Sequence, residues 1–226
     1  MKRLAAIIIC SVFMAVSLTG CADKVWEITD EYENGGGVIV SPEGVRYHCT
    51  SVSHVVGFKT DKKLGIIPDT YGRKDERVCS IDGADSGMYI AVQDRTERFV
   101  FDTRPEYSVF IRSGEDIDYT STDITEVAFM PIAGLTDDYA EYIETNGLFG
   151  DEAKAAMQDI YDNEGEFALN EYIGNIVYRQ EGMDWCYFLA FVRYSYEEGF
   201  FVILNGKHYL LPEHTVKALG ISYTES

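Results

Sequence analysis

The chain has 226 residues, of which 46% are hydrophobic and 13% aromatic, so it can bury a core and is predicted to fold as one large domain or two small ones. Its 38 Asp and Glu residues outnumber its 19 Lys and Arg residues, which gives a net charge of −19 at pH 7. A surface this acidic repels phosphate backbones and anionic headgroups, which excludes nucleic acid as a partner.

The first 21 residues have the layout of an export signal. Lys2 and Arg3 give a positive start, and residues 4–17 carry no charge and are mostly apolar. This run is shorter than the ~20 residues that a membrane-spanning helix needs. Leu-Thr-Gly-Cys at 18–21 then resembles the lipobox of bacterial lipoproteins. A plain signal peptide or an N-terminal helix is the alternative interpretation.

The lipobox resemblance implies a lipid-anchored protein. Residues 1–20 would be removed, and Cys21 would carry the lipid and become the N-terminus on the extracytoplasmic side of the cell membrane. Ala22 stands where an aspartate would resemble an inner-membrane retention signal. The processed chain would keep 17 basic residues against 38 acidic ones, a net charge of −21. Membrane contact is therefore expected to come from the lipid and not from a basic patch.

The number and spacing of the cysteines do not determine whether the protein contains a disulfide. Cys10 lies in the leader and Cys21 is the predicted lipid site, so Cys49, Cys79 and Cys186 remain. Cys49 and Cys79 could form a disulfide if their strands are neighbours. Cys186 is predicted to be a small core residue.

We expect an α+β fold in which an antiparallel β-rich half precedes two short helices, a C-terminal antiparallel sheet and a final short helix. Residues 21–37 are predicted to be the lipidated N-terminus and a flexible tether, although Trp26 also permits an edge strand over 25–28. We place a β-rich domain at 38–130 and an α+β domain at 131–226. A single α+β domain is the alternative.

The β-rich half consists of short runs of β-branched and aromatic residues, separated by turns roughly every eight to twelve positions. This spacing favours an antiparallel sheet or small barrel over parallel crossovers. A hairpin is predicted from 38–40 and 45–49 around the turn 41–44. A polar loop is predicted after 62–65, up to Arg77. Further strands are expected at 52–58, 78–81, 88–92, 98–101, 107–111 and 126–130.

Two helices are predicted after Pro131. Thr136 can cap a helix over 137–145, which Asn146-Gly147 would end. The second predicted helix begins at Gly150 and ends at 163–165. One face of this helix would carry Phe149, Ala153, Met157, Ile160 and Tyr161.

Strands return after the second helix, at 172–179, 185–196 and 200–204. The second of these is apolar on both faces and is expected at the centre of its sheet. Asn205-Gly206 predicts a tight hairpin to 207–211, and a short helix from Pro212 to Leu219 follows. Residues 202–221 resemble the hairpin-plus-helix unit of copper amine oxidase N-terminal-like domains, which are non-catalytic modules of bacterial envelope proteins. The family's usual proline–leucine–arginine run after the hairpin is absent.

The sequence offers no metal or cofactor motif. His48, His54, His208 and His214 lack the spacing of a zinc helix and are expected on the surface. Residues 82–87 superficially resemble a calcium loop but lack its ligand pattern, so a turn is the better prediction. Asp116, Asp118 and Asp123 are interpreted as a solvated loop.

Catalytic motifs are also missing: there is no nucleophile elbow, phosphate loop or dinucleotide fingerprint. The expected function is therefore a non-catalytic binding or interaction module of the cell envelope, anchored through Cys21, with no cofactor. The alternative is an envelope hydrolase that uses a carboxylate pair. A cleft with two facing carboxylates, one desolvated, would favour the enzyme, whereas an open aromatic surface would favour binding. The tyrosines that could form such a surface are Tyr178, Tyr187, Tyr194, Tyr196 and Tyr209.

Overall fold

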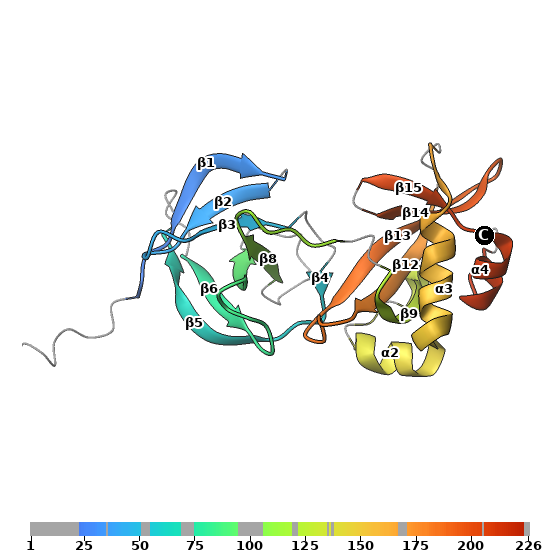
Figure 1. Cartoon of the computed structure of the whole chain (residues 1–226), viewed down its shortest axis with the longest axis horizontal. Coiled ribbons are helices and arrows are strands. Elements are labelled where there is room, and N and C mark those ends of the chain that lie inside the picture. The colour runs from blue at the N-terminus through green and yellow to red at the C-terminus, as the bar shows by residue number, and fades with distance from the viewer. Residues whose placement is uncertain are drawn as a thin grey trace, which may run out of the picture.

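In the computed structural model, two antiparallel β-sheets lie side by side along the long axis of the molecule, and the helices surround the second sheet (Figure 1). Mostly antiparallel strands with a few helices agree with the coarse fold class expected from the sequence. The structure describes residues 23–34, 36–50, 55–68, 75–94, 106–118, 122–134, 136, 138–166, 171–204 and 206–223.

The first sheet has seven strands, all paired with antiparallel neighbours. The predicted hairpin is present: Val38 pairs with His48 and Val40 with Arg46, and Gly44 turns the chain with a φ of +81°. In spatial order the strands are β1 (Glu27–Glu33), β2 (Gly36–Val40), β3 (Arg46–Cys49), β8 (Glu106–Arg112), β7 (Tyr89–Asp94), β6 (Glu76–Ile81) and β5 (Thr60–Ile67).

The residues just before β1 close the first sheet on itself. Val25 forms a parallel bridge with Ile66 of β5, the Trp26 N–H donates to the Ile66 carbonyl (2.8 Å) and the Ile66 N–H donates to the Lys24 carbonyl (2.9 Å). An ion pair of 2.6 Å between Lys63 and Asp23 lies beside this contact. The chain is therefore part of the sheet from Asp23 onward. The flexible tether predicted over 21–37 is wrong for the part that the structure describes, because β1 and β2 occupy it.

Trp26 fills the interior of the closed sheet. It is only 4% exposed, and its ring centroid lies 5.7 Å from that of Tyr47. A Cβ on Gly65 would come within 2.6 Å of the indole, so only glycine lets β5 approach this closely. The other buried members of this core are Ile39, Ile67, Val78, Ile90 and Val92.

The second sheet has the central strand that the sequence predicts. Its order is β10 (Leu148–Phe149), β9 (Ile124–Pro131), β12 (Glu171–Gln180), β13 (Tyr187–Ser195), β14 (Gly199–Leu204), β15 (Lys207–Leu210) and β11 (Glu164–Gly165). The short β4 (Val55–Val56) also pairs with β13, at Phe188 and Tyr187. Since β4 and β9 both belong to the second sheet, the expected boundary at Pro131 does not coincide with the division between the sheets.

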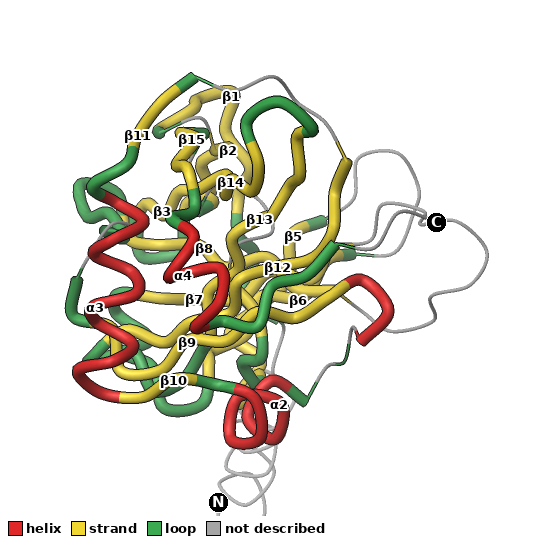
Figure 2. Tube along the Cα trace, turned by 90° about the vertical axis from the view of Figure 1, so that its right-hand side faces the viewer, coloured by secondary structure: helices red, strands yellow, loops and turns green. Residues whose placement is uncertain are grey.

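The helices cover both faces of the second sheet. Alternating residues of β9 point to opposite faces: Val127 and Phe129 pack with α3 (Gly150–Tyr161), and Ala128 and Met130 pack with α2 (Tyr139–Asn146). The final helix, α4 (Glu213–Ala218), lies next to α3, while α2 lies apart from both (Figure 2). A 3₁₀ turn, η1 (Ile132–Gly134), follows β9.

Helix starts differ in detail from the sequence predictions. Asp138, and not Thr136, caps α2, because its Oδ1 accepts from the Glu141 N–H (3.1 Å). Thr136 accepts from the Asp138 N–H instead. The apolar face predicted for α3 is buried at Ala153, Met157 and Ile160, but Phe149 is exposed.

Other sequence predictions are wrong or untested. β5 extends to Ile67, within the stretch interpreted as a loop. His48 is not on the surface: it is 1% exposed, because β3 lies inside the sheet, and its Nδ1 lies 3.5 Å from Glu33 Oε1. The strand at 98–101, residues 51–54 with His54, and Cys21 lie outside the described residues.

Cys49 and Cys79 form no disulfide, because β8 and β7 lie between their strands. Cys186 is buried in the second core, as predicted. In the described part of the chain no helix is long and apolar enough to cross a membrane.

Truncating the closure residue, Trp26→Ala, should lower the free energy of unfolding by about 3–5 kcal/mol, because it empties the interior of the first sheet. Denaturant unfolding measures this. Tyr32→Ala is the control: Tyr32 lies in adjacent β1 and is 79% exposed, so the loss should stay within about 0.5 kcal/mol. Equal small losses would mean that this segment is a tether.

Burial raises the pKa of the Cys79 and Cys186 thiols, so little thiolate forms near neutral pH. Iodoacetamide at pH 8 should therefore modify both slowly in the native protein and rapidly in denaturant. Peptide mass spectrometry measures the extent at each position. Rapid native modification of Cys186 would contradict its placement in the core.

Candidate functional site

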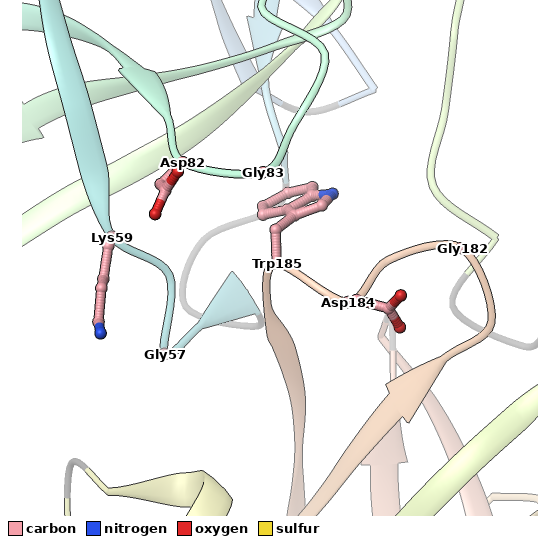
Figure 3. Close-up of a pocket in the computed structure, with 7 residues that line it drawn as sticks. All are labelled: Gly57, Lys59, Asp82, Gly83, Gly182, Asp184 and Trp185. Atoms are coloured by element: carbon pink, nitrogen blue, oxygen red, sulfur yellow. The ribbon is translucent and has the colours of Figure 1, made fainter.

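An open cleft lies where the two sheets meet. Its volume is about 400 Å³, within the range of about 300–1,000 Å³ typical of small-molecule sites. The residues that line it come from the β4–β5 connection, the β6–β7 turn and the β12–β13 hairpin. They are Gly57, Lys59, Asp82, Gly83, Gly182, Asp184 and Trp185 (Figure 3).

Trp185 lies at the centre of the cleft. The indole is half-buried, and its centroid lies 5.0 Å from that of Tyr89 of β7. Together with Val55 and Phe58, Trp185 packs against the core of the second sheet and against a separate cluster on the first sheet. The buried residues of that cluster are Ile81, Ala91 and Val109. A Cβ on Gly83 would stand 3.4 Å from the Trp185 Cβ, so the β6–β7 turn passes close to it. The indole is thus held in place by both halves of the molecule.

Three charged side chains line the cleft together with the indole, and all three extend away from the ring (Figure 3). Lys59, Asp82 and Asp184 are all exposed, and Asp82 and Asp184 lie on opposite sides of Trp185 (Figure 3). The Asp82 N–H donates to the Lys59 carbonyl (2.8 Å), which ties the two connections together. The cleft is therefore lined by two carboxylates that accept hydrogen bonds, one ammonium group that donates them, and one aromatic ring.

Gly57 shapes the lower wall of the cleft. Its φ is +70°, and a Cβ there would come within 2.8 Å of Tyr187 and 3.1 Å of Tyr139. Behind it, the Arg179 guanidinium lies 4.2 Å from the centre of the Tyr187 ring and pairs with Glu126 at 3.2 Å. Burial raises the pKa of Tyr187, which stays a neutral phenol. This wall is a packed support with its polar groups facing inward.

Of the loop predicted at 82–87, the first two residues line the cleft. The loop is a turn between β6 and β7, as expected, and the Gly87 N–H donates to Asp85 Oδ1 (2.8 Å). The acidic residues Asp116 and Asp118 lie between β8 and β9 and are not part of the cleft. Trp185 was not predicted from the sequence as a site residue. The available signal was an aromatic residue directly after the glycine-containing turn Glu181–Asp184.

Two of the histidines that were predicted on the surface, His208 and His214, have different neighbours in the structure. His214 Nε2 lies 2.7 Å from Asp159 Oδ2, and His208 packs beside Phe201 on β15. Within the described ranges, no group of three or more His, Cys, Asp or Glu side chains could hold a metal ion.

The predicted tyrosine surface is divided. Tyr178, Tyr187 and Tyr209 are buried, whereas Tyr194 and Tyr196 form an aromatic cluster with Tyr223 at another part of the second sheet. The rings of Tyr194 and Tyr223 stack at 4.3 Å. The Tyr223 hydroxyl donates to Glu171 Oε2 (2.6 Å), which raises its pKa. These contacts hold the C-terminal segment against β12 and β13.

Comparison with protein-family models, with curated proteins and with solved structures finds no match for this chain. The geometry of the cleft is therefore the basis for the functional argument.

Gly57→Ala should destabilise the protein more than Gly182→Ala. Both glycines have a positive φ, +70° and +79°, and both variants carry the backbone penalty of about 1–2 kcal/mol. A Cβ at Gly182 meets nothing within 4 Å, whereas one at Gly57 overlaps Tyr187. Overpacking should add about 1–3 kcal/mol.

Thermal and denaturant unfolding of the two variants measure this difference, with Gly182→Ala as the matched control. Equal losses would show that β4 does not approach Tyr187 closely.

Proposed function

We propose that this chain is a lipid-anchored, extracytoplasmic binding protein of the bacterial cell envelope, without catalytic activity, that holds its ligand in the cleft around Trp185. The observation that carries the binding proposal is an aromatic ring that is fixed by both sheets in an open cleft, whose walls also carry exposed charged side chains. Such sites combine an apolar surface with a few polar groups that orient the ligand.

The cleft carboxylates support binding more than acid–base chemistry. A general acid that works near neutral pH needs a carboxyl group whose pKa is raised by burial or by a close like charge. Asp82 and Asp184 are both exposed and lie on opposite sides of the Trp185 indole. Solvated carboxylates in this arrangement are suited to accept hydrogen bonds from a ligand.

The proposed anchor fits the position of the first sheet. In the lipobox interpretation Cys21 carries the lipid, and only Ala22 separates it from Asp23, which is already held by Lys63. The first sheet would therefore lie close to the membrane. The start of the described chain lies beside Ile66 near the end of β5, whereas Lys59, which lines the cleft, directly precedes the beginning of β5, so the cleft would lie away from the lipid. Two acyl chains make such anchoring stable.

The anchor is tested by metabolic labelling with an alkyne fatty acid in a bacterial host. Wild-type protein should incorporate the label and fractionate with membranes, because Cys21 is acylated. Cys21→Ser should lose the label and its processing. Cys10→Ser, which changes the cysteine of the leader, is the matched control and should behave as wild type. Unchanged labelling of Cys21→Ser, or an unprocessed cytosolic wild-type product, would contradict the proposal.

A further inference from the structure

We propose that the ligand of the cleft is a neutral carbohydrate whose ring stacks on the Trp185 indole. This inference rests on the proposed binding function and names its ligand class. The apolar C–H face of a sugar ring matches a flat aromatic surface, and its hydroxyl groups match acceptors and donors at the edge of that surface.

The Trp185 indole is preorganised for stacking. Its contact with Tyr89 at 5.0 Å and its packing against both sheets fix its orientation before a ligand arrives. Three glycines line the cleft, so no side chain at Gly57, Gly83 or Gly182 obstructs access to the ring. A ring that is already fixed loses little entropy when a ligand stacks on it, which favours binding.

The polar groups suit hydroxyls better than ions. Asp82 and Asp184 can each accept hydrogen bonds from neighbouring hydroxyls, and the Lys59 ammonium can donate to another. A phosphate or other anion would meet two carboxylates on a chain with a net charge of −19. A cation would be attracted by Asp82 and Asp184 but repelled by Lys59, and it would meet a single aromatic ring, where cation recognition uses several. A neutral polyhydroxylated ring can both donate and accept hydrogen bonds, so it is repelled by none of the three side chains.

The test is isothermal titration of the full-length protein in a detergent without a sugar headgroup, with three neutral tetrasaccharides as probes: chitotetraose, cellotetraose and maltotetraose. At least one should bind with a Kd below 1 mM. Trp185→Ala should weaken that binding at least tenfold. Asp82→Asn and Asp184→Asn should each weaken it about threefold to tenfold, the value of one or two hydrogen bonds.

Two further variants keep the result interpretable. Tyr196→Ala removes an exposed aromatic side chain of the Tyr194–Tyr223 cluster and should leave binding unchanged. Trp185→Phe keeps an apolar ring between the two sheets and should bind more weakly than wild type while unfolding at a similar temperature. It therefore replaces Trp185→Ala if that variant fails to fold.

The inference is overturned if none of the three tetrasaccharides binds at millimolar concentration, or if binding is indifferent to Trp185, Asp82 and Asp184. Release of shorter sugars from a bound probe, measured by chromatography, would instead overturn the non-catalytic assignment. Failure of sugar binding leaves the fatty-acid labelling of Cys21 unaffected, so failure of the ligand class and failure of the anchor are distinguishable.

Discussion

The contact between Trp185 and Tyr89 joins the two sheets, and the shape of the cleft depends on it. Tyr89 belongs to the first sheet and Trp185 to the hairpin that precedes β13, so this pair links residues far apart in the chain. The short β4 strengthens the junction, since it lies in the chain between β3 and β5 of the first sheet and pairs with β13 of the second. Hydrophobic side chains on both sides, with Trp185 among them, form one continuous apolar contact. A ligand in the cleft would therefore touch both halves at once.

The closure of the first sheet determines how a lipid on Cys21 would orient the junction between the two sheets relative to the membrane. Trp26 and Ile66 join the start of the described chain to β5, so the segment next to Cys21 is part of the folded body. An anchored molecule would be held close to the membrane through its first sheet, with the second sheet outward. Its acidic surface would keep it from binding anionic headgroups directly. The lipid would then supply the membrane affinity, and the protein surface would remain available for a ligand.

Local patterns predicted much of the secondary structure. The 3.6-residue period of Ala153, Met157 and Ile160 predicted the buried face of α3, and the Asn-Gly pair predicted the β14–β15 hairpin. The strand β13 is apolar on both faces, which predicted its position at the centre of the second sheet. The lipobox is also a local signal, carried by residues 1–21 alone. These features depend on neighbours in the sequence, which is why the sequence alone contains them.

Long-range contacts decided the rest. Trp26 stands among acidic residues typical of a tether, and only its pairing with Ile66 and its packing on Gly65 make it a core residue. His48 was predicted on the surface, but it is buried because its strand, β3, pairs with β2 on one side and β8 on the other. Trp185 becomes a site residue only because the β4–β5 connection and the β6–β7 turn, which are far from it in the sequence, line the same cleft. The sequence by itself determined most of the strands and helices, and it carries the resemblance to an export signal. The tertiary structure decided the closure and the cleft, because both arise from burial between segments that the sequence keeps far apart.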